Sequence, residues 1–210
     1  MTRILLVRHG QTEWNRQEIF RGRTNIPLSD VGRMQAAALA GRLSAERLLA
    51  IYCSPLMRAY ETAECIADCH GLHAQQISDL TDMDYGAWEG LQHAQVAQEY
   101  APLYARWRSE PHLVQPPDGE TLAQVRERAV TALDDLAARH PNATAVVVSH
   151  RVVNKLILCH ALGLGNDAFW RIRQSTCCLN LLEWERARTV VSLLNDTCHL
   201  RGLEEDTSDF

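Results

Sequence analysis

Residues 3–10 read RILLVRHG, a short aliphatic run that stops abruptly at an arginine, a histidine and a glycine. A run of this length, closed by a turn signal, is typical of a buried strand. Residues 144–150 read TAVVVSH, follow the same plan and also end in a histidine. Residues 48–53 read LLAIYC and form a third run. We therefore expect a sheet of buried strands, two of which deliver a histidine at their carboxyl ends.

Helical patterns alternate with these strands. Apolar residues recur at helical spacing within residues 31–43, 54–70, 121–139 and 152–162. Weaker strand candidates are residues 74–77, 178–184 and 189–194, the last two as a hairpin around residues 185–188. Strands that alternate with helices predict an α/β protein, here a three-layer sandwich around a mostly parallel central sheet.

Residues 79–119 break this alternation. Residues from about 92 to 109 look helical, and Pro111, Pro116 and Pro117 mark a loop. A chain of 210 residues has the length of one domain. We therefore interpret residues 1–210 as a single domain with a small helical cap insertion at about residues 79–119, and we expect the acidic tail at residues 204–210 to fray.

Composition narrows the class of protein. Apolar residues make up 46% of the chain and charged residues 22%, which are ordinary values for a globular protein. The net charge of −5, from 21 basic and 26 acidic side chains, argues against a nucleic-acid-binding protein. Seven cysteines, an odd number, do not suggest a disulfide framework in a chain of this length. No apolar run reaches the ~18 residues of a membrane helix, and the first residues lack a signal-peptide core. We expect a cytoplasmic protein without membrane or nucleic-acid partners.

The carboxyl ends of the predicted parallel strands are where such a sheet binds ligands. Arg8 and His9 lie at the end of the strand expected at residues 3–7, and His150 lies at the end of the strand expected at residues 144–149. Arg58 lies in the first turn of the helix that follows the strand expected at residues 48–53. Guanidinium groups hold phosphate oxygens in pairs, a neutral imidazole attacks phosphorus, and a protonated second histidine would offset the developing charge. The pattern predicts a phosphoryl-transfer site, whose proton source is one of the carboxylates of Asp79, Asp82 and Asp84.

A metal site is the alternative chemistry. Cys65, Cys69, His70 and His73 lie close together in the sequence. The chain lacks the paired CxxC and the HExxH motifs of zinc proteins, and no Walker loop or GxGxxG follows a strand. We interpret Cys65 and Cys69 as filling the buried face of an alanine-rich helix. We therefore expect neither a metal nor a cofactor.

Six motifs along the chain carry a family resemblance. They are LVRHGQTEWN at residues 6–15, PLS at 27–29 with Gly32, SPL at 54–56 with Arg58, YGAWEG at 85–90, GETL at 119–122 and VVSH at 147–150. The ordered set resembles the histidine phosphatase superfamily, also called phosphoglycerate-mutase-like, over about residues 3–200. Residues 168–170 and 195–200 look most like the metal-independent phosphoserine phosphatases within it.

The resemblance implies catalytic roles. His9 would be the phosphorylated nucleophile, with Arg8, Arg58 and His150 around the phosphoryl group. The carboxylate that matches the family's proton donor falls at Asp82, where family members usually carry glutamate. Aspartate is one methylene shorter, so it can serve if burial raises its pKa or if the backbone brings it closer.

Further substrate contacts are expected beside this cluster. The resemblance implies that Asn15 shares the phosphate pocket. Arg21 and Arg23 either contact the substrate or belong to a solvated loop, and Tyr85 either contacts the substrate or only packs. Arg151 follows the second histidine, where many family members have glycine, and it either adds charge at the substrate end or points outward.

The function implied is a phosphomonoesterase that hydrolyses a small phosphorylated metabolite through a phosphohistidine, with phosphoserine as the leading candidate. A cofactor-dependent phosphoglycerate mutase or an α-ribazole phosphatase would use the same residues. A catalytically inactive relative that binds phosphorylated ligands is an alternative of another class, which the presence of both histidines argues against. The sequence leaves a homodimer open.

Overall fold

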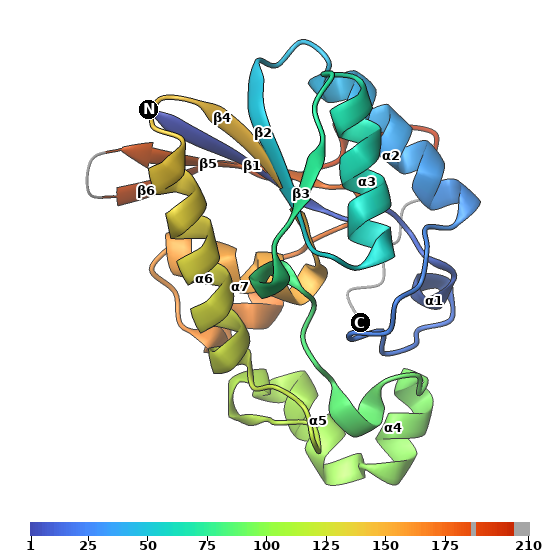
Figure 1. Cartoon of the computed structure of the whole chain (residues 1–210). Helices are drawn as coiled ribbons and strands as arrows, with labels where there is room; N and C mark the ends of the chain where they lie inside the picture. Colours follow the sequence, from blue (N-terminus) through green and yellow to red (C-terminus); the bar gives the residue numbers. More distant parts are fainter. Residues whose placement is uncertain (186–187, 204–210) are drawn as a thin grey trace.

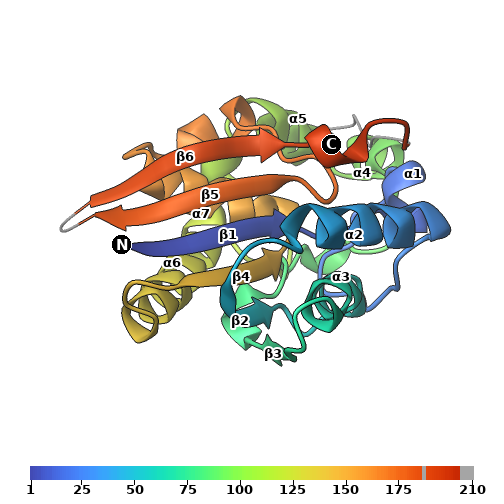
Figure 2. The same cartoon turned by 90° about the horizontal axis from the view of Figure 1, so that it is seen from above.

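The computed structural model describes residues 1–185 and 188–203. Its centre is a six-stranded sheet with the order β3-β2-β4-β1-β5-β6 (Figures 1 and 2). The strands are β1 (Thr2–Arg8), β2 (Leu48–Cys53), β3 (Ala74–Gln76), β4 (Thr144–Ser149), β5 (Leu179–Glu185) and β6 (Arg188–Asp196). The strands from β3 to β1 are parallel, and β5 and β6 add an antiparallel hairpin. The mostly parallel sheet is confirmed, whereas the hairpin turn at 186–187 and the expected frayed tail at 204–210 lie outside the described residues.

The pairing of β1 with β4 determines where the two histidines lie. These parallel neighbours are in register from Arg3 opposite Thr144 to Arg8 opposite Ser149. Both strands are buried along almost their whole length, as expected for parallel strands covered on both faces. Because the two strands end at the same level, the residue that follows each of them, a histidine, emerges at the same edge of the sheet.

Helices cover both faces of the sheet (Figure 2). The long helices are α2 (Asp30–Leu43) and α3 (Met57–Asp68) on one face, and α6 (Leu122–Arg139) and α7 (Arg151–Ala161) on the other. Side chains alternate between the two cores along β1: Ile4 and Leu6 pack with α6 and α7, and Leu5 and Val7 pack with α2 and α3. The predicted three-layer sandwich is therefore confirmed.

Two helices differ from the sequence expectation, one in its start and one in its existence. Helix α3 begins at Met57, one turn later than expected, because Pro55 lies in a bend and Leu56 is still extended. A single helical turn, α1 (Glu13–Arg16), follows the first histidine motif and was not expected; Thr12 and Asn15 form a capping box at its start. Within the described ranges, no helix combines the length and the apolar character that crossing a membrane requires.

Most of the segment after β3 gathers at one end of the molecule (Figure 1), although its first turn stays beside the end of β4, where the Ser149 hydroxyl donates to the Leu80 carbonyl. Its elements are η1 (Ser78–Leu80), η2 (Gly86–Trp88), α4 (His93–Glu99), α5 (Ala101–Ser109) and η3 (Pro111–Leu113). The helical character expected at residues 92–109 is confirmed, but it is divided between α4 and α5. The backbone leaves helical geometry at Tyr100, and Pro102, which has no N–H, occupies the first turn of α5. Trp107 then packs against Phe169 and Trp170 of η4 (Asn166–Arg171), which anchors this segment to the main body. A last turn, η5 (Cys198–Leu200), follows β6.

The close approach of two loops in this segment yields a stability prediction. Gly86 has φ +51°, and a Cβ atom there would lie 2.0 Å from the Pro117 carbonyl oxygen. Gly90 also has a positive φ, of +81°, but a Cβ atom there would meet nothing within 4 Å. We expect Gly90→Ala to lower the free energy of unfolding by about 1 kcal/mol from backbone strain alone. Gly86→Ala should cost about 3 kcal/mol or more, because strain and overpacking add.

Urea unfolding of the two variants checks this prediction. Equal losses of stability would show that the contact between the Gly86 and Pro117 loops does not constrain the fold.

Candidate active site

The strand ends bring the two histidines together, as the sequence predicts. The His9 and His150 rings lie with their centroids 5.2 Å apart, and both side chains are buried. The His9 backbone N–H donates to the Ser149 carbonyl at 3.0 Å, which ties the end of β1 to the end of β4. His150 is the N-cap residue of α7, so its ring lies at the amino end of that helix.

The protonation state of His9 follows from its contacts. Its Nδ1 lies 2.6 Å from the Gly10 carbonyl oxygen. A carbonyl can only accept, so Nδ1 carries the proton and Nε2 keeps a lone pair. Burial, and next the Arg58 guanidinium, hold the pKa of His9 well below its usual value. The ring is therefore neutral at neutral pH, with Nε2 available as a nucleophile.

Arg8 and Arg58 are both fully buried beside these rings. Arg58 donates from Nη1 to the Thr24 carbonyl at 2.9 Å and from Nη2 to the Gly22 carbonyl at 2.8 Å. Arg8 donates from Nη1 to the Gln174 carbonyl. Backbone carbonyls, which carry no net charge, thus orient both guanidinium groups. Such a pair of cations is suited to hold phosphate oxygens.

The structure separates the three candidate proton donors. Asp82 is buried, and its Oδ2 lies 3.2 Å from Nη2 of Arg58 and 3.6 Å from Nδ1 of His150. Asp84 instead pairs with Arg23, and Asp79 is exposed. Of the three, Asp82 is the carboxylate brought to the histidines.

The second histidine is held by a residue that sequence reasoning did not single out as part of the site. Ser54, directly after β2, has its hydroxyl 2.7 Å from Nε2 of His150. Burial, and next Arg58, hold the pKa of His150 well below its usual value. The neutral form is favoured until an anion offsets the surrounding arginines. A serine at the end of a buried strand, beside the Ser-Pro motif, is the signal that could have found it.

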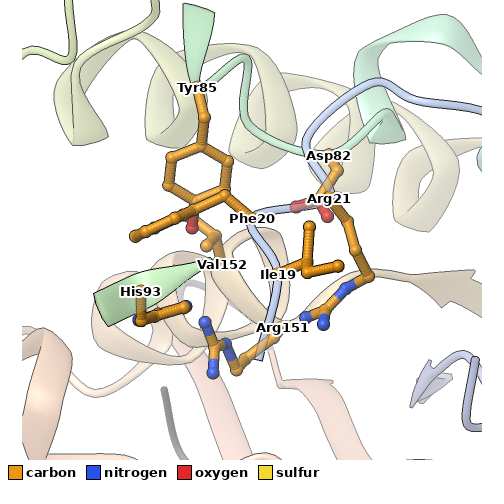
Figure 3. Close-up of a pocket in the computed structure, with 8 residues that line it drawn as sticks. All are labelled: Ile19, Phe20, Arg21, Asp82, Tyr85, His93, Arg151 and Val152. Atoms are coloured by element: carbon orange, nitrogen blue, oxygen red, sulfur yellow. The ribbon is translucent and has the colours of Figure 1, made fainter. Parts of the chain in front are cut away.

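A small pocket opens beside this cluster (Figure 3). The lining residues are Ile19, Phe20, Arg21, Asp82, Tyr85, His93, Arg151 and Val152. The Arg21 and Arg151 side chains reach into the same space, and both are buried (Figure 3). Arg21 Nε, Arg151 Nε and Arg151 Nη1 have no hydrogen-bond partner within the described part of the chain. Burial, and next the Arg151 charge, lower the pKa of Arg21 to about 9.

The pocket lining distinguishes the positions of four residues for which the sequence left two alternatives. Arg21, Tyr85 and Arg151 line it, whereas Arg23 does not, is 46% exposed and pairs with Asp84 and Glu120. Tyr85 is buried, and burial raises the pKa of its phenol to about 12, which keeps the hydroxyl protonated. 

Asn15 is also buried, and its side-chain oxygen accepts the backbone N–H and the hydroxyl of Thr12, both at 2.9 Å. Its share in the phosphate pocket stays a prediction.

His93 is a pocket residue that the sequence did not single out. Its ring stacks on Phe20 with centroids 4.0 Å apart and planes 8° apart, and its Nδ1 lies 3.2 Å from the Tyr104 hydroxyl. Burial, and next the Arg151 charge, lower the pKa of His93 to about 3. The aromatic spacing of the cap residues held no signal for this placement, because it depends on the fold bringing α4 against residues 19–21.

The cysteine expectation is partly wrong. Cys65 is half-buried against the core, as expected, but Cys69 is exposed because α3 ends at Asp68. Across residues 1–185 and 188–203, no group of three or more histidine, cysteine, aspartate or glutamate side chains is arranged to hold a metal ion.

Comparisons with known proteins agree with this geometry. The family model "Histidine phosphatase superfamily (branch 1)" matches residues 4–197. "Phosphoserine phosphatase 1" of Hydrogenobacter thermophilus is 38% identical over 200 residues, which cover 95% of each chain. Bacillus stearothermophilus YhfR has a similar structure, with a TM-score of 0.92 at 30% identity, covering 95% of this chain and 100% of that one. A mutant phosphoserine phosphatase of Entamoeba histolytica, solved in complex with phosphoserine, has a TM-score of 0.85 at 27% identity, with 95% and 100% covered.

The neutral state of His93 gives a pH prediction. Its pKa rises from about 3 in the folded protein to 6.5 on unfolding, so the unfolded state binds the extra proton and stability falls as the pH drops below 6.5. Between pH 7 and pH 5 this one group should cost about 2 kcal/mol. His93→Phe keeps a ring against Phe20 but cannot titrate, so its loss over the same interval should be about 2 kcal/mol smaller.

Urea unfolding of wild type and His93→Phe at both pH values measures this difference. An identical pH dependence in the two proteins would contradict a buried, neutral imidazole at this position.

Proposed function

The chain belongs to the histidine phosphatase superfamily and is a phosphoric monoester hydrolase; from this premise we propose that His9 is its phosphorylated nucleophile and that O-phosphoserine is its substrate. The observation that carries the proposal is the bond from Nδ1 of His9 to the Gly10 carbonyl. It leaves Nε2 unprotonated on a ring that the charges of the buried Arg58 and Arg8 influence, and attack on phosphorus requires such a free lone pair.

The proposed reaction has two steps. Nε2 of His9 attacks phosphorus while Asp82, in its acid form, gives its proton to the departing serine oxygen. The P–O bond to serine breaks as the P–N bond forms, and Arg8, Arg58 and His150 bind the remaining phosphoryl oxygens. The Asp82 carboxylate then takes a proton from water, whose oxygen attacks phosphorus and releases phosphate and His9. The position of Asp82, with Oδ2 3.2 Å from Nη2 of Arg58 and 3.6 Å from Nδ1 of His150, supports this assignment.

The pocket supports a substrate that carries a second anion. Arg21 and Arg151 are buried with guanidinium nitrogens that lack partners in the described chain. A buried charge without a partner is costly, so a ligand that supplies an anion there gains binding energy. The carboxylate of O-phosphoserine is such an anion, and the relatives named phosphoserine phosphatases point to the same compound.

The cap segment contributes to this selection. It supplies Tyr85 and His93 to the pocket, next to Asp82. We assign residues 79–119 the role of a cap that shapes the substrate end of the site, while the strand ends of the main body supply the groups that bind phosphate.

The phosphohistidine itself is the first prediction of this proposal. The protein, dialysed against EDTA, should release phosphate from O-phosphoserine. Quenching with labelled substrate should trap an acid-labile, alkali-stable label on His9. His9→Ala should lower turnover by roughly 10³- to 10⁶-fold, because the covalent route is lost. A label on another residue, or transfer of the phosphoryl group between the positions of 3-phosphoglycerate without release, would overturn the proposal.

The role of Arg151 is tested by a matched pair of substrates. O-phosphoethanolamine equals O-phosphoserine without the carboxylate. Arg151→Met should lower kcat/KM for O-phosphoserine by roughly 10- to 100-fold, the loss expected for one charged hydrogen bond. Turnover of O-phosphoethanolamine should change less than about threefold.

Arg23→Met serves as the control for this experiment, because it removes a nearby positive charge that does not line the pocket. It should leave the ratio between the two substrates unchanged. An equal loss on both substrates in Arg151→Met would mean that Arg151 does not bind the carboxylate.

A further inference from the structure

Arg128 on α6 uses every donor of its guanidinium group. Nη1 donates to the carbonyls of Asp79 and Thr81, at 2.7 and 2.6 Å, and Nη2 donates to the carbonyl of Asp82 at 3.1 Å. Nε and Nη2 also bind both carboxylate oxygens of Glu120, at 3.0 and 2.9 Å. An arginine has five N–H donors, and all five are engaged here. Three of these bonds go to the backbone that carries Asp82.

The remaining carbonyl of this stretch is bound from the opposite side. The hydroxyl of Ser149 donates to the Leu80 carbonyl at 2.7 Å. Ser149 is the last residue of β4 and directly precedes His150. Residues 79–82 are therefore held between α6 and the end of β4, so the backbone at Asp82 has a fixed position relative to His150.

Glu120 completes the arrangement. It accepts the Asp84 backbone N–H at 2.9 Å through its carboxylate, and its own backbone N–H donates to the Asp84 carbonyl at 2.9 Å. Both Arg128 and Glu120 side chains are mostly buried, with 17% exposed, so this ion pair is better shielded than a surface pair. The segment is held on both sides of Asp82.

From these contacts we infer that Arg128, oriented by Glu120, is the positioning residue for the proton donor Asp82. The inference rests on the proposed role of Asp82. An aspartate side chain is short and has only two rotatable bonds, so the place of its carboxylate follows the place of its backbone. Holding that backbone through three carbonyls keeps Oδ2 next to the site where the leaving oxygen must lie. Arg128 touches neither histidine in this scheme and acts through Asp82.

The experiment uses the leaving group as its readout. A serine alkoxide needs a proton as it departs, whereas p-nitrophenolate is a stabilised anion that departs with little help. Arg128→Met should slow single-turnover formation of phosphohistidine from O-phosphoserine by roughly 10- to 100-fold, a part of the effect of general acid catalysis. The same step from p-nitrophenyl phosphate should slow less than about threefold, and vanadate should bind as tightly as to wild type.

A double-mutant comparison strengthens this readout. In an Asp82→Asn background, which has no acid to position, adding Arg128→Met should change the O-phosphoserine rate less than about twofold. A role confined to general stability would slow both substrates alike and would act equally in both backgrounds.

Arg126→Met is the matched control. Arg126 lies on the same helix and donates to the Leu164 carbonyl and the Asn166 side chain, both at 2.9 Å, away from Asp82. Arg126→Met should leave the rate of phosphohistidine formation unchanged with both O-phosphoserine and p-nitrophenyl phosphate. If Arg128→Met does not fold, Arg128→Lys, which keeps the charge without the fork, takes its place in the same comparison.

The outcomes separate the two proposals. If wild type forms no phosphohistidine on His9, the proposed function fails. If wild type forms it and the Arg128 variants slow both substrates equally, or neither, the positioning role of Arg128 fails while the proposed function stands.

Discussion

The burial of positive charge at one edge of the sheet is the constraint on which the site depends. Arg8, Arg21, Arg58 and Arg151 are all buried around one small region, and Asp82 is the carboxylate that pairs with one of them. Removing guanidinium groups from water costs free energy that a folded chain must offset. Backbone carbonyls offset part of it without neutralising the charge. A phosphomonoester that also carries a carboxylate would offset the positive potential that remains.

The same potential explains why histidine can serve as the nucleophile. Neighbouring cations and burial both disfavour the imidazolium, so His9 and His150 are neutral before an anion arrives. In the proposed reaction, a phosphate dianion that enters the site would offset the arginines, and the neutral His9 would meet it with the lone pair that the Gly10 contact leaves on Nε2. One electrostatic arrangement would therefore attract the substrate and keep the attacking atom unprotonated.

The parts of the fold that the sequence predicts are those with strong local signals. The strands at residues 3–8, 48–53 and 144–149 are uninterrupted apolar runs, and their parallel pairing brings the histidines together at one edge. Local sequence signals failed where tertiary contacts determine the course of the chain. Residues 92–109 have helical composition throughout, yet the chain turns at Tyr100 to lay Trp107 on η4. Cys69 looked like part of an apolar helix face, but α3 ends before it. His93 and Arg128 carry no local sequence signal of their positions, because the segments that each of them contacts lie more than 20 residues away.

The backbone carbonyls that orient the arginines are the part of the site that the sequence predicts least. Arg58 is oriented by the carbonyls of residues 22 and 24, Arg8 by that of residue 174, and Arg128 by those of residues 79, 81 and 82. Any residue type offers the same carbonyl, so a motif records the arginine and not its anchor. The anchors lie in loops whose course depends on packing, such as the contact of Gly86 with Pro117. The distances between the reacting groups are therefore a property of the loops, and substitutions in those loops can shift the chemistry while every motif residue stays in place.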